Sequence, residues 1–380
     1  MLDAAFFTGV VDIEVTKSSS RLKLNTQLYL ERSDVSESVE VVNPLLDDQW
    51  DSLLKSYANA TIFHGSLWAR VLCETYGYQP AYFLVRHGNR LLGLLPCMEV
   101  GSWFTGYRGV ALPFTDRSEA LIAEDIEPGV LLSSVLKQAG AREWRSFVLH
   151  GESSVPAFAI PSLAFYTHSL DLSLPCDRLF KGCKDTVRRH VRQAQRNGLV
   201  VEIGSSSRLM DAYYSLHCLT RKKHGIPPQP VEFFRSIQRN LLQTGLGFVT
   251  IARAKARPVA GAVFLHQGTR AYYKFGASDK DDLHLRGNNL VMWESICHLK
   301  SEGFVTLDFG RTSITNRGLR RYKLGWGTKE SMVHYYRFDF RKNRFVEDTD
   351  HASGFHNWIF SMMPVPALRW CGRVLYRHIA

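Results

Sequence analysis

Three strand-like runs in the second half of the chain, joined only by short turns, are the feature that most constrains the fold. They occupy residues 247–253, 259–266 and 270–277, and turns this short predict an antiparallel meander. A helical pattern over 288–302 and a buried-type strand over 304–309 follow the meander. Strands paired in this way and flanked by helices predict an α/β (α+β) fold with mixed, mostly antiparallel sheets.

The length of the chain predicts more than one domain. Its 380 residues exceed what a single hydrophobic core usually serves, and a stretch containing Pro and Ser over 151–161 marks a boundary. The first half has helical patterns over 48–57, 66–75 and 128–140, and strands over 81–86, 90–99 and 146–150. We predict four regions: a poorly ordered head over 1–44, a first domain over 45–160, a second domain over 161–345 and a C-terminal helical tail over 346–380.

The charge balance favours anionic partners. Lys and Arg number 47 against 36 Asp and Glu, which gives a formal net charge of +11. Such an excess suits nucleic acid, a phosphorylated substrate or an anionic membrane surface, and does not choose among them. The seven scattered cysteines form no C-x-x-C pair. This pattern predicts neither a zinc site nor a disulfide framework, and it fits a reducing cytoplasm.

Several familiar signals do not occur in the sequence. No stretch of 18 apolar residues occurs, and the first residues lack the basic start of a signal peptide. We therefore expect a cytoplasmic protein. The sequence also lacks G-x-S-x-G, a P-loop and H-E-x-x-H, which argues against the hydrolase and nucleotide-binding classes that use these motifs. We expect no metal site and no permanently bound cofactor.

The densest basic element lies in a helical pattern over 177–198, predicted to break near Gly182. Lys184, Arg188, Arg192 and Arg196 recur every four residues, so they share one helical face. One interpretation is an ordinary solvated face. The other is a surface that binds phosphate groups of a substrate such as tRNA, a nucleotide sugar or a polyprenyl phosphate.

Two further segments have the composition of ligand sites. His284 to Asn289 precedes a helix, and with Asn288 as the N-cap its backbone N–H groups could hold a pyrophosphate or carboxylate. Asp308 to Arg311 ends a buried strand, and the segment 316–327 after it is predicted to be a glycine-rich loop. Lys323 in that loop could stabilise an oxyanion in acyl transfer. The alternative interpretations are a common glycine before a helix and a structural turn with a snorkelling lysine.

The C-terminus carries a second arginine stripe. Arg369, Arg373 and Arg377 repeat every four residues, opposite apolar positions that include Leu368 and Leu375. A helix that docks on the protein and closes the fold explains this pattern. A helix lying on anionic lipid is the alternative.

Taken in order, these segments resemble a known family. The run from Lys184 to Gly198 is similar to the R-x-x-I-R-K-A-x-x-x-G helix of FemAB-like proteins. The meander, the Tyr272–Ala277 strand, the helix containing Trp293 and the segment 308–327 follow in the same order. Together they resemble the FemAB branch of the GNAT superfamily, also described as a BioF2-like acetyltransferase domain. The tail is similar to that of FemAB proteins associated with exosortase/PEP-CTERM and exopolysaccharide loci.

The resemblance implies tandem GNAT-like domains that transfer an acyl or aminoacyl group to an amine of a cell-envelope, peptidoglycan or exopolysaccharide precursor. His284 stands where GNAT enzymes carry Gln or Arg in their coenzyme A loop, and no long coiled-coil arm is present, so acyl-CoA and aminoacyl-tRNA both stay open as donors. A non-catalytic scaffold that binds an anionic polymer or lipid-linked sugar is the alternative. The site residues predicted on this basis are Lys323, Tyr322 and Asp308 for catalysis; Arg286, Gly287, Asn288 and Asn289 for the donor; and Arg188, Arg192, Lys274, Arg311, Asn316, Arg320 and Trp326 for the substrate.

Overall fold

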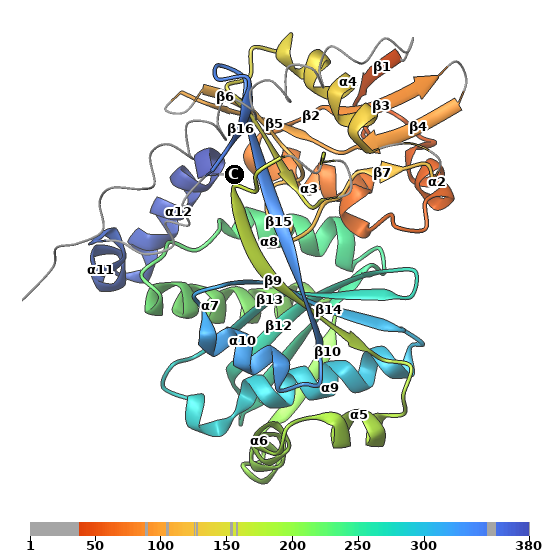
Figure 1. Cartoon of the computed structure of the whole chain (residues 1–380). Helices are drawn as coiled ribbons and strands as arrows, with labels where there is room; N and C mark the ends of the chain where they lie inside the picture. The colour runs from red at the N-terminus through yellow and green to blue at the C-terminus, as the bar shows by residue number, and fades with distance from the viewer. Residues whose placement is uncertain are drawn as a thin grey trace, which may run out of the picture.

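The computed structural model describes residues 38–87, 90–103, 106–124, 126, 128–152, 155–156, 159–347 and 355–379. Two sheets organise this part of the chain (Figure 1). The smaller sheet belongs to the first half and has the order β1 (Ser38–Val42), β3 (Tyr82–His87), β4 (Arg90–Leu95) and β7 (Leu121–Ile122).

The larger sheet is continuous through both halves. Its order is β10 (Val200–Gly204), β11 (Gly247–Ala254), β12 (Arg257–Gln267), β13 (Arg270–Ser278), β14 (Thr306–Ser313), β9 (Leu163–Asp171), β15 (Lys329–Asp339), β8 (Ser146–His150), β6 (Gly106–Val110), β5 (Met98–Ser102) and β2 (Gln79–Pro80), with β16 (Arg344–Val346) beside β15. Among the described strands, the pairs β13–β14 and β6–β8 are parallel and the others are antiparallel. The predicted mixed, mostly antiparallel α/β fold is therefore confirmed.

Helices cover the sheets on both faces. They are α2 (Trp50–Leu53), η1 (Leu54–Ser56), η2 (Ile62–His64), α3 (Ser66–Tyr76), α4 (Pro128–Gly140), α5 (Cys176–Gly182), α6 (Asp185–Arg196), α7 (Ser207–Lys223), α8 (Val231–Ile237), η3 (Gln238–Leu242), η4 (Leu283–Leu285), α9 (Gly287–Ser301), α10 (Arg317–Leu324), α11 (Phe355–Met362) and α12 (Val365–Ile379). In the second half, α7 and α8 bury apolar side chains against one face of the meander and α6 and α9 against the other.

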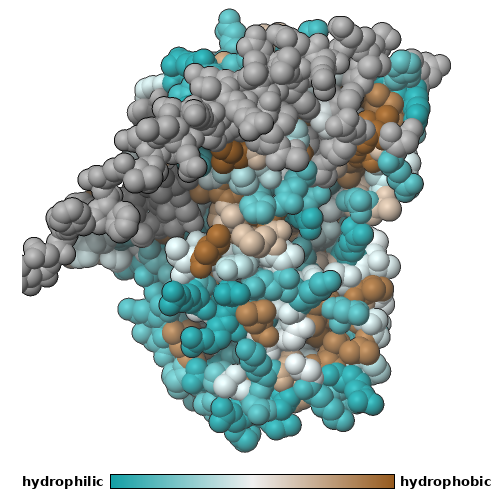
Figure 2. Space-filling view, in the orientation of Figure 1, coloured by the Kyte–Doolittle hydropathy of each residue, from teal (hydrophilic) through white to brown (hydrophobic). Residues whose placement is uncertain are grey.

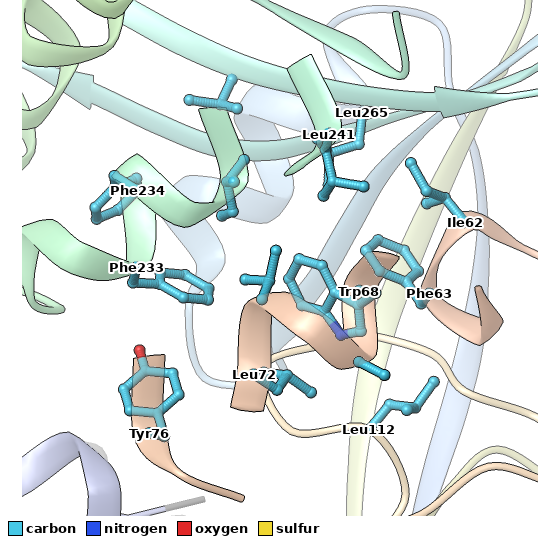
Figure 3. Close-up of a cluster of buried hydrophobic side chains, with 14 of the residues drawn as sticks. Ile62, Phe63, Trp68, Leu72, Tyr76, Leu112, Phe233, Phe234, Leu241 and Leu265 are labelled. Carbon is cyan, nitrogen blue, oxygen red and sulfur yellow. The ribbon is translucent and has the colours of Figure 1, made fainter. Parts of the chain in front are cut away.

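A shared apolar cluster joins the two halves (Figure 3). Trp68 on α3 meets the ring of Phe233 on α8 edge-on, with the centroids 6.1 Å apart. Phe63 on η2 meets Tyr272 on β13 in the same way, at 5.1 Å. Buried aromatic rings contribute large apolar areas and prefer such edge-to-face contacts. The first half is therefore fixed against the strand that lines the site described below.

Most of the predicted elements of the second half are present, including the meander and the break of the first helix at Gly182. Three local predictions are wrong. The segment 317–324 is the helix α10 rather than a loop, since the Asn316 side chain caps its first turn. Helix α9 begins at Gly287 with Arg286 as its N-cap, not Asn288. The run 90–99 is divided between β4 and β5, which lie in different sheets, and Pro96 separates them.

Two of the predicted regions can be compared with the strands that the structure shows. Residues 38–42, assigned to a poorly ordered head, form β1 and pair with β3, whereas residues 1–37 of that head lie outside the described residues. Strand β15, assigned to the second domain, pairs with β9 along one part and with β8 of the first half along another. The two halves therefore share one sheet, and the borders between domains stay predictions.

Candidate active site

The parallel pair β13–β14 opens into a cavity. The two strands pair only between Arg270–Tyr272 and Thr306–Asp308, and β14 then bulges in its pairing with β9 between Asp308 and Arg311. A cavity of about 440 Å³ lies at this point. Its lining comes from both halves of the chain: Asn59, Thr61, Phe63, His64, Asp116, Arg117, Glu119, Ser169, Arg270, Ala271, Tyr272, Tyr273, Lys274, Thr306, Asp308 and Gly310.

Asp308 is a carboxylate in the wall of this cavity. The backbone N–H of Gly310 donates to its Oδ1 at 2.6 Å, which fixes the carboxylate across the bulge. Burial raises the pKa of Asp308, and the negative charge of Asp116 adds to this, while the Gly310 N–H opposes it. A carboxylate with a raised pKa holds a proton more readily than an exposed one. Asp308 therefore has the character of a general base.

A second carboxylate, Asp116, reaches the cavity from the first half. It follows β6, and its Oδ2 lies 3.6 Å from Nζ of Lys274 while its Oδ1 lies 3.6 Å from Nε of Arg311. Burial opposes its ionisation, but Lys274 and Arg311 outweigh burial and lower the pKa of Asp116. Gly310 has φ +70°, and a Cβ there would come within 2.6 Å of Asp116 Oδ2. Only glycine therefore fits beneath this carboxylate.

Lys274 is a buried cation among aromatic rings. Its Nζ lies 5.2 Å from the ring centre of Phe63 and 5.9 Å from that of Trp68, within the range of cation–π attraction. Burial lowers the pKa of Lys274, and Asp116 partly restores it. The residue was predicted as a substrate contact, and the structure places it in the cavity wall with Asp116 as its acidic partner.

Lys323 supports the bulge from outside the cavity. It lies on α10, is 2% exposed, and its Nζ donates to the carbonyl oxygens of Gly310 at 2.8 Å and Arg311 at 2.9 Å. Burial lowers its pKa to about 8, although Asp116 and Asp308 favour the ammonium. Its neighbour Tyr322 is partly buried, and its hydroxyl donates to the carbonyl oxygen of Asn288 at 3.4 Å. The ammonium therefore holds the backbone on which Asp308 is mounted.

The remaining predicted residues around β14 have structural partners. Arg311 stacks over Phe165 at 4.4 Å in addition to its contact with Asp116. Arg320 makes two hydrogen bonds to the carboxylate of Glu330, at 2.8 and 2.7 Å. Asn316 caps α10, and Trp326 is buried in the apolar core. Arg311 thus reaches the cavity through its ion pair with Asp116.

The predicted donor residues lie at the start of α9. Arg286 has φ +62°, and a Cβ on Gly287 would lie 2.9 Å from Cβ of Ala260, so glycine permits the helix to approach β12 closely. Asn288 donates to Oγ of Ser278 at 3.0 Å. Asn289 is buried. This group lies on the α9 face of the sheet, apart from the residues that line the cavity.

Helix α6 lies beside the start of α9. Gln193 donates to the carbonyl oxygen of His284 at 3.4 Å. Arg188 donates to the carbonyl oxygens of Lys181 and Cys183, both at 2.6 Å, so it closes the end of α5. Arg192 stacks over Phe180 at 5.6 Å and is exposed. Figure 2 shows hydrophilic residues at the lower end of the molecule, where α5 and α6 lie.

The sequence predicted Asp308, Lys274, Arg311 and Lys323 as site residues, and the structure brings these four side chains near one another. The sequence did not predict Asp116 or His64, the polar side chain of η2, both of which line the cavity. Asp116 stands in a loop with no motif around it, so no local signal distinguishes it. Within the described residues, no group of three or more His, Cys, Asp or Glu side chains could hold a metal ion, and no helix of this part of the chain is long and apolar enough to cross a bilayer.

Comparisons with known proteins agree with the resemblance. Residues 181–329 match the family model described as an acetyltransferase (GNAT) domain. The crystal structure of FemX superposes with a TM-score of 0.60 at 14% identity, over 78% of this chain and 96% of that chain. A tandem GNAT protein from the clavulanic acid biosynthesis pathway gives 0.52 at 11% identity, over 80% and 99%.

A third solved structure is the C-terminal domain of a putative lysylphosphatidylglycerol synthetase from Agrobacterium fabrum. Its TM-score is 0.50 at 13% identity, over 82% of this chain and 91% of that chain. No curated protein shows significant sequence similarity to the chain. These likenesses establish the fold over both halves, and the family match covers the part that contains α6, the meander, α9, β14 and α10.

Proposed function

We propose that the protein transfers an acyl or aminoacyl group to an amine of an anionic cell-envelope or exopolysaccharide precursor, because residues 181–329 match an acetyltransferase (GNAT) domain and the fold is similar to that of FemX. The observation that carries the proposal is the carboxylate of Asp308 in the wall of a cavity where β13 and β14 diverge. The proposed place of action is the cytoplasm, at the inner face of the membrane.

The proposed reaction begins with an amine acceptor in the cavity. Asp308 takes a proton from the acceptor nitrogen, directly or through water, and its raised pKa suits it to this step. The nitrogen then forms a bond to the carbonyl carbon of a thioester or ester. The bond from that carbon to sulfur or oxygen breaks, and the leaving group departs with a proton returned from Asp308.

Backbone groups are available for the oxyanion of this reaction. Beyond Tyr272 the edge of β13 that faces β14 has no paired strand among the described residues, so N–H groups on this edge can donate to a developing negative charge. Lys323 contacts two carbonyl oxygens of the bulge. We therefore assign it the role of positioning β14, with Tyr322 beside it, rather than contact with the oxyanion.

The donor is proposed to bind at the start of α9, on the face of the meander that α6 and α9 cover. Arg286 and the first N–H groups of α9, at Gly287 and Asn288, offer positive charge and hydrogen-bond donors to phosphate groups, whereas the Asn289 N–H donates to the carbonyl oxygen of Arg286 at 3.0 Å. Arg192 on the neighbouring α6 adds exposed positive charge. Acyl-CoA and aminoacyl-tRNA both carry phosphates, so this arrangement serves either donor.

Calorimetric titration with acetyl-CoA, with CoA and with charged tRNA tests the proposal. Saturable binding of acetyl-CoA, weakened in Arg286→Gln but not in the exposed control Arg178→Gln, supports an acyl-CoA enzyme. Binding of charged tRNA alone, falling steeply with salt, supports the aminoacyl donor. Binding of neither donor would contradict a transferase.

The alternative is a non-catalytic GNAT-like scaffold that binds an anionic polymer or a lipid-linked sugar. Lys323→Ala separates the two functions, because it removes the support of the bulge that carries Asp308 and leaves α6 and α9 unchanged. We expect this variant to lose acyl transfer and to keep anion binding. A protein that binds anions with full affinity and transfers no acyl group to any amine acceptor would favour the scaffold.

A further inference from the structure

Helix α12 at the C-terminal end of the chain has two different faces. Leu368, Gly372 and Tyr376 are buried against the body of the protein, and a Cβ on Gly372 would come within 1.9 Å of the carbonyl oxygen of Pro228. The face turned away from the body carries Trp370, which is 67% exposed, and Val374. The helix is therefore docked, as one interpretation of the sequence predicted, and still exposes large apolar side chains.

A segment from the first half extends this exposed face. Arg108 on β6 donates to the carbonyl oxygen of His378 at 2.8 Å, and the ring of Trp103 lies 6.5 Å from that of His378. Trp103 at the tip of the β5–β6 hairpin is 86% exposed, and Tyr107 beside it is also exposed. The hairpin and α12 thus form one surface from distant parts of the chain.

This C-terminal surface consists of eight apolar and three basic side chains. They are Trp103, Tyr107, Trp358, Ile359, Met362, Trp370, Val374 and Leu375, with Arg369, Arg373 and Arg377. Exposed apolar side chains of this size, gathered rather than scattered, mark an interaction surface. Three tryptophans among them favour a boundary that is apolar on one side and wet on the other.

The charge of the surface decides between the possible partners. Residues 355–379 contain the three arginines and no Asp or Glu. Nε of Arg373 lies 3.9 Å from Oε1 of Glu232, which is a long ion pair. A second copy of this chain would bring the same arginines against each other, which opposes self-association. An acidic surface with an apolar interior complements both kinds of side chain.

We propose that the C-terminal surface binds the anionic face of a lipid bilayer. Trp103, Trp358 and Trp370 lie at the level of the headgroups, and Arg373 and Arg377 contact lipid phosphates while their aliphatic stems stay in the apolar layer. Arg369 stacks over Tyr214 of α7 at 5.1 Å and adds its charge from beside the protein body. The inference goes beyond the proposed acyl transfer, because vesicle binding requires neither donor nor acceptor. The enzyme would thereby be held beside precursors that are anchored in the membrane.

Flotation of the full chain with vesicles tests the inference. Vesicles of phosphatidylcholine with one third phosphatidylglycerol are compared with vesicles of phosphatidylcholine alone. We expect binding to the anionic vesicles, weakened at least about tenfold by Arg369→Gln/Arg373→Gln/Arg377→Gln, since each basic residue near such a surface contributes strongly to binding. Trp103→Ser/Trp370→Ser is expected to weaken binding as well, and brominated lipid should quench the wild-type tryptophan fluorescence.

Matched variants at the far end of the molecule serve as controls. Arg178→Gln/Arg189→Gln/Arg196→Gln removes the same charge from α5 and α6, and Leu174→Ser removes an exposed apolar side chain. Both should bind anionic vesicles like the wild type, and thermal unfolding checks that every variant is folded. Absence of binding, equal binding to both vesicles, or equal losses in the charge-matched triple variants would overturn the inference. So would sedimentation of a dimer that Trp370→Ser dissociates without any vesicle binding.

Discussion

Charged side chains gather in two regions that were assigned to one activity, the cavity between β13 and β14 and the outer face of α6. In the cavity wall, Lys274 is buried and lies against Asp116, and the supporting Lys323 is fixed by two carbonyl oxygens. On α6, Arg192 and Arg196 are exposed to solvent. A buried charge that loses its partner costs several kcal/mol, whereas an exposed charge is screened by water and salt. The comparison therefore predicts large effects of substitution at the cavity and small effects on α6.

The largest expected effect is at Asp308. Asp308→Asn keeps the shape of the side chain and removes the base, so we expect the rate of acyl transfer to fall about 10²- to 10⁴-fold while donor affinity changes little. Single-turnover kinetics and calorimetry measure the two quantities. Asp177→Asn, on the exposed surface of α5, is the control. Removal of a general base usually slows a reaction by about 10²- to 10⁴-fold. A variant whose rate stays within about threefold of the wild type would therefore exclude Asp308 as the base.

The next effect is on stability. Asp116→Asn leaves the buried ammonium of Lys274 without its acidic partner, and we expect the free energy of unfolding to fall by about 3 kcal/mol. Urea denaturation measures this change. Lys274→Met in the same chain should restore part of the loss, because it removes the unpaired charge. If the double variant is less stable than the single one, the ion pair does not account for the effect.

The third effect is the pH dependence of acyl transfer, which we expect to follow the charge of Lys323. Its ammonium has a pKa of about 8 in the folded protein, so it loses its positive charge as the pH rises through that value, and its hydrogen bonds to the two carbonyl oxygens of the bulge become weaker. We expect the transfer rate to fall about tenfold per pH unit above this pKa. Lys323→Arg keeps its charge at these pH values and should move the alkaline decline upward. If the transfer rate of this variant declines at the same pH as that of the wild type, another group causes the decline.

The smallest effect is expected on α6. Arg192→Gln should weaken donor binding about two- to threefold at low salt, as is usual for an exposed charge. The difference should vanish at high salt, where the Debye length is about 3 Å. Calorimetry at two salt concentrations measures both. A loss as large as that of the cavity variants would show that α6 contacts the donor directly and would remove the contrast between the two regions.

The elements around the site could be predicted because their signals are local. Alternating side chains and short turns indicated β11, β12 and β13, and the residues at the end of β14 stood out by their composition. Asp116 could not be predicted, because its role arises only when the first half packs against β13. Helix α10 was missed because Gly318, Gly325 and Gly327 favour a loop, whereas the Asn316 cap and the buried Lys323 stabilise a helix.

The groups that the arginines contact could not be predicted from the sequence either. A repeat of four residues placed Arg188 and Arg192 on one face, but Arg188 turns back to the end of α5. Arg320 pairs with Glu330 on β15. Each contact joins elements whose relative position is set by the tertiary fold, so charge patterning alone could not separate structural arginines from exposed ones.

Strand β15 has a consequence for how the protein opens. Its residues 329–335 pair with β9 and its residues 335–339 with β8, so Tyr335 belongs to both ladders. Separating the halves would break one of these two ladders, because β15 can stay with only one half. Exposure of the β15 amides to hydrogen exchange requires loss of the β9 ladder for residues 329–335 and of the β8 ladder for residues 335–339, so Tyr335 is the point at which opening of one half reaches the other.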